Sequence, residues 1–303
     1  MLFTRFRFWG VMLLLFAYLF GILILSIISL HDTKSIGYRD SLDLKHKQLS
    51  KSKSFEYGLP GFRPPLRKSK IIWCSDLKLL DPPKETIALA SFPGSGNTWL
   101  RYLLQQATGF LTGSVYKDYG LLKNGFPAES FLNGSVLVVK THEWGSAARN
   151  RFSKAILLVR APSACIQAEF NRQSGGHIGF ASPDRYKRLR GRYWHQFVND
   201  KLRGWQQMNL DWLYNFTGPT HVIFYEQLVD KVEHTLRTVM EFIDLPVDEE
   251  LFKCAMKRKE GIYRRKKRAL NFDPYTAKMK EKMQKVQDKV YEAIYNFAAP
   301  ATR

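Results

Sequence analysis

The sequence has few cysteines, and it has no lysine at the place where a nucleotide-triphosphate loop needs one. Only three of its 303 residues are cysteines, Cys74, Cys165 and Cys254, so a disulfide scaffold is excluded. One disulfide with a spare thiol and three buried thiols are both compatible with these positions. The Gly-rich stretch SFPGSGNTWL, residues 91–100, lacks the G-K-[ST] ending of a P-loop, and no Walker-type acidic strand end accompanies it. Both absences disfavour a nucleotide kinase or another P-loop phosphotransferase.

Charged residues are absent from a run near the start of the chain, residues 9–30. Its about 22 residues correspond to roughly 33 Å of helix, enough to cross the hydrocarbon core of a bilayer. Arg5 and Arg7 precede the run, so the positive-inside rule predicts a cytoplasmic tail at 1–8, a transmembrane signal anchor at 9–30 and a luminal remainder. The alternatives are a cleaved signal peptide, for which the run is too long, and a buried helix.

A Lys- and Ser-rich segment that is poor in aliphatic residues follows, from 31 to about 70. It cannot bury enough apolar surface to fold alone, so we expect a luminal stem over 31–80 and one large domain over 81–303. Two N-x-S/T sequons, at Asn133 and Asn215, are compatible with glycosylation of a luminal domain.

The formal net charge of +20 favours acidic partners such as phosphates, sulfated or carboxylated glycans, nucleic acids or anionic membranes. The densest basic run is KRKEGIYRRKKR, residues 257–268. In a soluble protein it would suggest nucleic-acid binding or nuclear import, but behind a membrane anchor that interpretation loses most of its weight. A solvated basic face is the remaining alternative.

Short apolar runs alternate with helical stretches from about Asp81 onward. This alternation predicts an α/β fold with a mostly parallel sheet flanked by helices. Four strands are predicted, at residues 86–91, 135–140, 155–160 and 221–225. Helical stripes are predicted for Leu228, Val232, Leu236, Met240 and Ile243, and for Met279, Met283, Val286, Val290, Ile294 and Phe297. Ligands of such sheets bind at the carboxyl ends of the strands, so functional residues are expected there.

Polar motifs follow the first two predicted strands. Gly94 and Gly96 allow the backbone to approach a ligand closely, and the next helix points its free N–H groups at the same place. A tight connection without a ligand is the alternative. After the second strand, KTHEWG places Lys140 and His142 two residues apart, so that both side chains point to the same crevice. Histidine is suited to removing a proton near neutral pH.

The third predicted strand ends in VRAPSACIQAEFNR. Arg160 at the strand end is a suitable ligand for an oxyanion, and Pro162 fits the first turn of a helix. Arg172 is either a second ligand or a surface arginine in an ion pair. The Gly-rich stretch QSGGHIGFASPD, residues 173–184, is expected to be a mobile loop near the acceptor site.

Together these motifs resemble a sulfotransferase that uses 3′-phosphoadenosine 5′-phosphosulfate (PAPS), and more narrowly the sulfotransferase part of the WSC-domain-containing (WSCD) family. The resemblance covers the chain from about Asp81 to the C-terminus. The motifs that carry it are, in chain order, SFPGSGNTW, KTHEW, VRAPSACIQAEFNR, FYEQLV and EGIYRRKKR. They imply a P-loop-like three-layer domain and sulfuryl transfer from PAPS as co-substrate.

The resemblance also implies roles for the matching residues. The loop residues that would hold the 5′-phosphosulfate are Gly94, Ser95, Gly96, Asn97 and Thr98. Trp99 and Tyr225 would lie near the adenine. The basic residues that would hold the 3′-phosphate are Arg160 with Arg264, Arg265 or Lys266. Lys140 would neutralise charge on the bridging oxygen, and His142 would take the proton from the acceptor hydroxyl. No metal is needed, and no His, Cys or Asp spacing suggests one.

Three departures from the family pattern stand out. Gly94 occupies the place where most sulfotransferases carry lysine, and either Lys140 or Arg101 would have to replace that charge. Ala168 stands where many relatives have serine, which leaves more of the 3′-phosphate grip to the basic segment. The stem lacks the Cys-rich WSC domains that name the family.

The expected protein is a single-pass type II membrane sulfotransferase of the Golgi, acting on a glycan hydroxyl of a glycoprotein or glycolipid. A sialylated glycan is one candidate acceptor. The alternative is a catalytically weak or inactive relative that acts as a membrane-anchored nucleotide-binding module. Nucleic acid is not expected as a partner.

Overall fold

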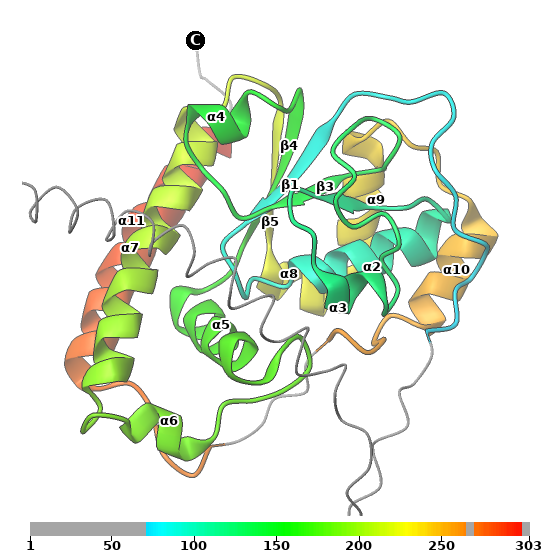
Figure 1. Ribbon diagram of the computed structural model, residues 1–303. Helices are drawn as coiled ribbons and strands as arrows, with labels where there is room; N and C mark the ends of the chain where they lie inside the picture. The colour runs from blue at the N-terminus through cyan, green and yellow to red at the C-terminus, as the bar shows by residue number, and fades with distance from the viewer. Residues whose placement is uncertain (1–70, 265–269, 299–303) are drawn as a thin grey trace, which may run out of the picture. The chain divides into compact units, whose positions relative to one another are not determined.

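A computed structural model describes residues 71–264 and 270–298 (Figure 1). The expected tail, the expected span at 9–30, most of the expected stem, and the residues Arg265 and Lys266 lie outside these ranges. Within the described ranges, no helix is both long enough and apolar enough to span a membrane.

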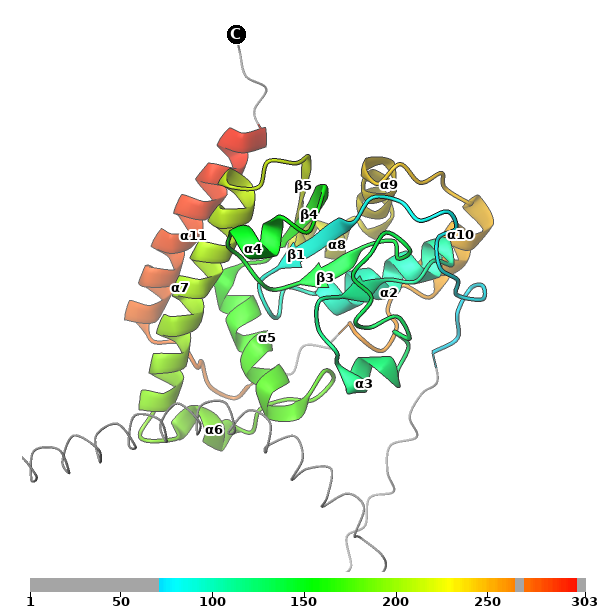
Figure 2. The same cartoon turned by 45° about the horizontal axis from the view of Figure 1, so that its top comes forward.

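Five parallel strands form one sheet in the middle of the described domain (Figures 1 and 2). Their bounds are β1 (Ile87–Ser91), β2 (Gly113–Ser114), β3 (Val139–Thr141), β4 (Lys154–Val159) and β5 (Thr220–Phe224). The order across the sheet is β2-β3-β1-β4-β5, and every neighbouring pair is parallel. The chain passes from one side of β1 to the other between β3 and β4. Such a switch places a ligand crevice at the carboxyl end of the central strand.

Helices cover both faces of the sheet because strand side chains alternate between them. Ala88 and Ala90 of β1 pack in one core cluster with α5 (Pro162–Gly175), α7 (Arg192–Tyr214) and α11 (Ala277–Ala298). Ile87 and Leu89 pack in the other cluster, whose helices include α2 (Asn97–Thr108), α8 (Tyr225–Asp230), α9 (Val232–Phe242) and α10 (Glu249–Lys257). Figure 1 shows α7 and α11 side by side on the left of the sheet and α2, α9 and α10 on its right. Three short helices complete the described part: α3 (Tyr119–Leu122), α4 (Ser146–Arg149) and α6 (Pro183–Lys187).

The helix ends follow from local chemistry. Gly96 precedes α2 with a φ of 98°, and Gly109 ends the same helix with a φ of 68°, its N–H donating to the Gln105 carbonyl. Pro162 occupies the first turn of α5, where its missing N–H costs nothing. The Asp248 carboxylate caps α10 by accepting from the amides of Glu250 and Leu251 in the first turn of the helix.

All four predicted strands are confirmed, although β3 is shorter than its apolar run. The two-residue strand β2 and the long helix α7 were not predicted. The stripe from Leu228 to Ile243 was predicted as one helix, which is wrong, because the chain leaves helical geometry at Lys231 and divides into α8 and α9. Residues 173–175 complete α5 instead of opening a loop.

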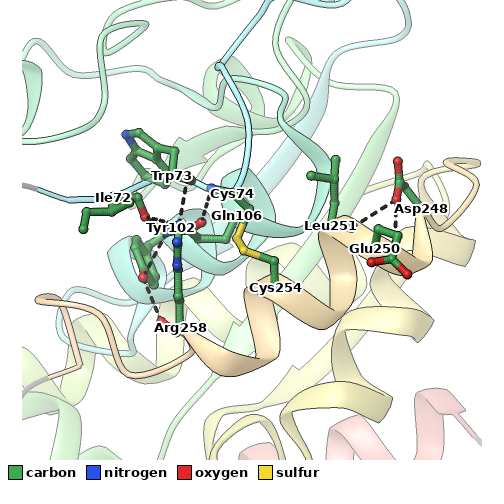
Figure 3. The surroundings of a disulfide bond; sticks show 10 residues. All are labelled: Ile72, Trp73, Cys74, Tyr102, Gln106, Asp248, Glu250, Leu251, Cys254 and Arg258. Carbon is green, nitrogen blue, oxygen red and sulfur yellow. Dashed lines mark hydrogen bonds between the residues drawn. A yellow bond between two sulfur atoms is a disulfide. The ribbon is translucent and has the colours of Figure 1, made fainter.

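The first described residues are bound to the domain. A disulfide joins Cys74 to Cys254 on α10, with 5.9 Å between the Cα atoms (Figure 3). The Cys74 N–H donates to Gln106 on α2, and the Gln106 amide donates to the Ile72 carbonyl. Cys165 is a buried free thiol. The sequence allowed two cysteine arrangements, and the structure has the one with a disulfide and a free thiol. Residues 71–80, which we placed in the stem, pack against the domain instead.

Candidate active site

A cavity of about 440 Å³ lies where β1, β3 and β4 end. The site residues expected from sequence that line it are Gly94, Gly96, Asn97, Thr98, Trp99, Lys140, His142, Arg160 and Tyr225. The additional lining residues are Pro93, Tyr116, Asp118, Ala168, Glu169, Arg172, Gln173, His177, Lys201 and Tyr263. The residues expected from sequence come from four separate parts of the chain and converge on one space, as expected for the carboxyl edge of a parallel sheet.

The loop after β1 presents backbone amides to this cavity. The Asn97 amide group donates to the Leu89 carbonyl at 2.9 Å and to the Ser91 hydroxyl at 3.0 Å, which fixes the loop to the strand end. No side chain caps the start of α2, so its first N–H groups and its positive dipole end face the cavity. Ser95 differs from the expectation, because its N–H donates to the Phe92 carbonyl and its side chain is buried outside the lining.

Gly94 leaves no room for a side chain. Its φ is +88°, and a Cβ placed there would lie 2.3 Å from the Cys165 carbonyl oxygen and 3.0 Å from the Glu169 amide nitrogen. Both contacts are to the backbone of α5, which cannot yield as the tip of a side chain would. The missing loop lysine is therefore accompanied by a helix packed directly on the loop.

Lys140, on β3, is the buried cation of the cavity. Its side chain has no acidic partner among the described residues, and its ammonium lies 5.6 Å from the centre of the Tyr116 ring. Burial, together with the nearby Arg101 charge, lowers the pKa of Lys140 to about 8. Lys140 is therefore charged near neutral pH, and an anion bound in the cavity would stabilise this charged form further, so Lys140 fits the role expected for it.

His142 follows β3 and is held in one orientation. Its Nδ1 lies 2.6 Å from the Ser91 carbonyl oxygen, which can only accept a hydrogen bond, so the proton of the neutral ring is on Nδ1. The lone pair is then on Nε2. Burial, with the charge of Lys140 as the next cause, holds the pKa of His142 well below its usual value. The ring is therefore neutral at physiological pH and can accept a proton.

Tyr116 connects these two residues. Its hydroxyl accepts the His142 backbone N–H at 3.0 Å, and its ring stacks on the imidazole with 5.8 Å between the centres. The same ring is the one that Lys140 approaches. Tyr116 thus orders both the imidazole and the ammonium, a role that the sequence did not indicate.

Arg160, Tyr225 and Trp99 line the aromatic end of the cavity. The Arg160 guanidinium donates to the Gly94 carbonyl at 2.8 Å and lies 4.1 Å from the centre of the Tyr225 ring. Its Nε is buried without a partner in the described part of the chain. The Trp99 ring is 6.0 Å from the Tyr225 ring and 5.1 Å from the Arg264 guanidinium carbon. This end combines aromatic faces with cations, a combination suited to a purine and a phosphate.

Arg101 does not reach the cavity. It is fully buried, pairs with Glu129 at 2.8 Å, and donates to the hydroxyl and the carbonyl of Thr112 at 3.0 Å each. Its guanidinium also covers the Phe126 ring at 4.3 Å. The hypothesis that Arg101 replaces the loop lysine is therefore wrong, and Lys140 is the remaining candidate.

A polar part of the cavity lining comes from the N-cap of α3, from α5 and from α7. The buried Glu169 carboxylate accepts from Arg172 at 2.6 and 2.8 Å and from Gln173 at 2.8 Å. Asp118 lies 2.7 Å from His177, and this bond keeps the pKa of Asp118 well below its usual value. Arg172 is thus an ion-paired residue, as one of the two interpretations held, but it also lines the cavity.

Two close relatives decide the family. A WSCD family member of Aedes aegypti is 50% identical over 96% of this chain and 97% of its own length. One of Drosophila melanogaster is 51% identical over 94% of this chain and 96% of its own length. The chain belongs to the WSCD family. The predicted resemblance is confirmed, and no family model matches the sequence.

Solved structures similar to this WSCD family member are remote. A mouse sulfotransferase complexed with PAP (3′-phosphoadenosine 5′-phosphate) is 16% identical, with a TM-score of 0.45, over 71% of this chain and 90% of that chain. A sulfotransferase domain from the curacin biosynthetic pathway is 17% identical, with a TM-score of 0.39, over 72% of this chain and 99% of that one. At these scores the likeness decides neither fold nor function. Among the described residues of the WSCD chain, no cluster of His, Cys, Asp and Glu could hold a metal ion.

Both sequons of this WSCD family member lie in described, exposed positions. The Asn133 carboxamide oxygen accepts from the Ser135 amide and hydroxyl, and the Asn215 amide group donates to Asp211. Exposure makes both asparagines accessible in the folded domain. Glycosylation at these positions stays a prediction.

Proposed function

We propose that this WSCD family member is a sulfotransferase that moves a sulfuryl group from PAPS to a hydroxyl of a glycan. The observation that carries the proposal is the orientation of His142. Its Nδ1–H is tied to the Ser91 carbonyl, and its Nε2 lone pair is left for an acceptor hydroxyl beside the unpaired ammonium of Lys140. A base and a cation side by side suit the transfer of a charged group to a hydroxyl.

The cavity residues fit PAPS at both of its phosphate ends. The uncapped start of α2 and Lys140 suit a 5′-phosphosulfate, because both are positive and lack an acidic partner in the described part of the chain. Arg160 suits the 3′-phosphate, since its buried Nε has no partner among residues 71–264 and 270–298. Trp99 and Tyr225, whose rings pack edge to face, offer an aromatic surface against which a purine would lie.

In the reaction, PAPS would supply the sulfuryl group and leave as PAP. His142 Nε2 would take the proton of the acceptor hydroxyl while its oxygen forms a bond to sulfur. Lys140 would stabilise the electron pair that the 5′-phosphate oxygen keeps when its bond to sulfur breaks. The α2 amides and Arg160 would hold the donor in line with the acceptor, and positioning of this kind supplies most of the catalysis in related group transfers.

A polar acceptor suits the polar part of the cavity lining. Asp118, Glu169, Arg172 and Gln173 all belong to it, and side chains of this kind match the hydroxyls of a sugar better than an apolar molecule. This polarity supports a glycan acceptor. Analysis of the sulfated products would show which hydroxyl of the glycan accepts the sulfuryl group and whether the acceptor contains sialic acid.

A type II topology with the domain in the Golgi lumen is part of the proposal. The charge-free run at 9–30 supports an anchor, and the Cys74–Cys254 disulfide is typical of an oxidising lumen. Expression of the full chain in animal cells tests this, because Asn133→Gln and Asn215→Gln each remove one glycosidase-sensitive shift in gel mobility if the domain is luminal. Absence of any glycosidase-sensitive shift, with cytosolic protease access to the domain, would contradict a luminal location.

The activity is tested with the purified full chain. We expect PAP to raise the melting temperature more than ADP or ATP does, and labelled sulfate to pass from PAPS to members of a glycan panel. The matched control for His142→Ala is His195→Ala, which alters an exposed histidine on α7 and should leave transfer unchanged. Binding of PAP without transfer to any glycan would favour the alternative of an inactive binding module. A preference for ATP over PAP would contradict both functions.

A further inference from the structure

The segment 258–264, which follows α10, supports the aromatic end of the cavity. The Trp99 indole N–H donates to the Lys259 carbonyl at 2.8 Å, and the Arg264 guanidinium lies over the same indole. Tyr263 lines the cavity directly, and its hydroxyl donates to the Asn124 carbonyl. The position of this segment therefore sets the position of Trp99 and Tyr263.

Helix α2 binds this segment on one side. The Tyr102 hydroxyl donates to the Arg258 carbonyl at 2.8 Å. Gly261 has a φ of +53°, and a Cβ there would lie 2.6 Å from the Tyr102 ring, so the backbone of the segment packs directly on that ring. Helix α2 begins directly after the Gly-rich loop and carries Trp99 in its first turn, so the segment packs on the helix that supplies both parts of the proposed nucleotide site.

The N-terminal segment at 72–74 also contacts Arg258, the first residue of the segment 258–264 (Figure 3). The Arg258 guanidinium donates to the Ile72 carbonyl at 3.1 Å and to the Trp73 carbonyl at 2.8 Å. Cys74 is joined to Cys254, which lies one helical turn before Arg258. The disulfide thus fixes the carbonyls of Ile72 and Trp73 relative to α10, at whose end Arg258 lies.

We propose that the Cys74–Cys254 disulfide and Arg258 are positioning elements of the nucleotide site, a proposal that rests on the proposed function. They hold 258–264 against α2, so that Trp99 and Tyr263 stand in place before the nucleotide arrives. Without the disulfide, 72–74 can separate from α10, and Arg258 loses its carbonyl partners. Ordering of 258–264 would then accompany binding and weaken it, because the ordering entropy is subtracted from the affinity.

The test measures the affinity of the full chain for PAP by calorimetry. We expect the double variant Cys74→Ser/Cys254→Ser to raise the Kd of PAP about tenfold, and Arg258→Ala to have a similar effect with the disulfide intact. Tyr102→Phe, which removes one hydroxyl from the same network, should raise Kd by a smaller factor. The KM for PAPS should rise with Kd while kcat at saturating PAPS changes less than about twofold, because Lys140 and His142 lie on and after β3.

The matched control is Asp248→Ala, which removes the cap at the other end of α10. It weakens the same helix, so it should lower the melting temperature without changing the Kd of PAP. An unchanged Kd in both Arg258→Ala and the cysteine variant would overturn this inference while leaving the proposed function intact. Failure of the unaltered chain to prefer PAP over ADP would instead contradict the proposed function itself.

Discussion

Replacing Gly94 should destabilise the domain, and a lysine introduced there should not improve catalysis. The sequence alone suggests the opposite, since most sulfotransferases carry lysine at this position. In the structure, the position is closed by the backbone of α5 and has a positive φ. Any side chain therefore has to displace a helix that also carries Glu169 and Arg172 of the cavity wall.

The size of the effect follows from two costs. A Cβ would lie 2.3 Å from the Cys165 carbonyl oxygen, and overpacking of this kind costs roughly 1–3 kcal/mol. The φ of +88° adds about 1 kcal/mol for an L side chain. Gly94→Ala should thus lower the free energy of unfolding by about 2–4 kcal/mol, or the melting temperature by on the order of 10 °C for a domain of this size. Gly94→Lys should cost at least as much.

Gly191→Ala separates the two costs. Gly191 has a similar φ of +81°, but a Cβ there would meet nothing within 4 Å. It should therefore show only the backbone cost, about 1 kcal/mol in urea unfolding. Equal destabilisation by the two alanine variants, or faster sulfate transfer in a stable Gly94→Lys protein, would refute the packing explanation.

Three further predictions concern the cavity. The kcat/KM should fall as pH rises through about 8, because Lys140, whose pKa is lowered to about 8, loses its charge there. Between pH 6 and 7.5 the kcat/KM should stay level, because His142, with its lowered pKa, remains neutral. A fall in kcat/KM below about pH 6.5 would contradict this. Tyr116→Phe should lower kcat about fivefold, because it removes the hydroxyl that accepts the His142 N–H. Tyr116→Leu should lower kcat clearly more, because it also removes the ring that stacks on the imidazole. Equal effects of the two variants would show that the ring plays no part. Arg160→Ala should reduce the preference for PAP over 5′-AMP by roughly 10–100-fold in calorimetry, whereas an unchanged preference would place the 3′-phosphate elsewhere.

The sheet was predictable because its strands are short apolar runs followed by polar motifs. Lys140, His142 and Arg160 could be placed at one crevice from their positions after those runs alone, since parallel strands end at the same edge. The strand β2 consists of Gly113 and Ser114, which carry no hydrophobic pattern. This strand was missed because it is recognisable only by its backbone pairing with β3, and not by a pattern of apolar side chains.

The helix break at Lys231 illustrates a different limit. Leu228 and Val232 keep the same phase as the residues that follow, so periodicity continues through a point where the backbone does not. Arg101 was misplaced for a related reason. Its partner Glu129 lies 28 positions away, in a stretch without helical or strand periodicity, and no local signal shows that the two meet.

No pattern in the sequence assigned a role in the site to Tyr116, Asp118 or His177, because each lies in a segment without helical or strand periodicity. Only the fold brings them beside β3 and α5. One weak signal was present, since His177 falls in the Gly-rich stretch that was expected near the acceptor. The close packing of Gly94 on α5 is likewise a property of tertiary structure that no motif reports.

The most direct test of the central claim is the single-turnover rate of sulfuryl transfer from PAPS in the full chain with His142 replaced by Ala. If His142 is the base, the rate should fall about 10³-fold, while the Kd of PAP stays within about twofold of the unaltered protein. Transfer that persists within tenfold in His142→Ala would contradict the account. So would an unaltered chain that binds PAP tightly and transfers no sulfate to any acceptor.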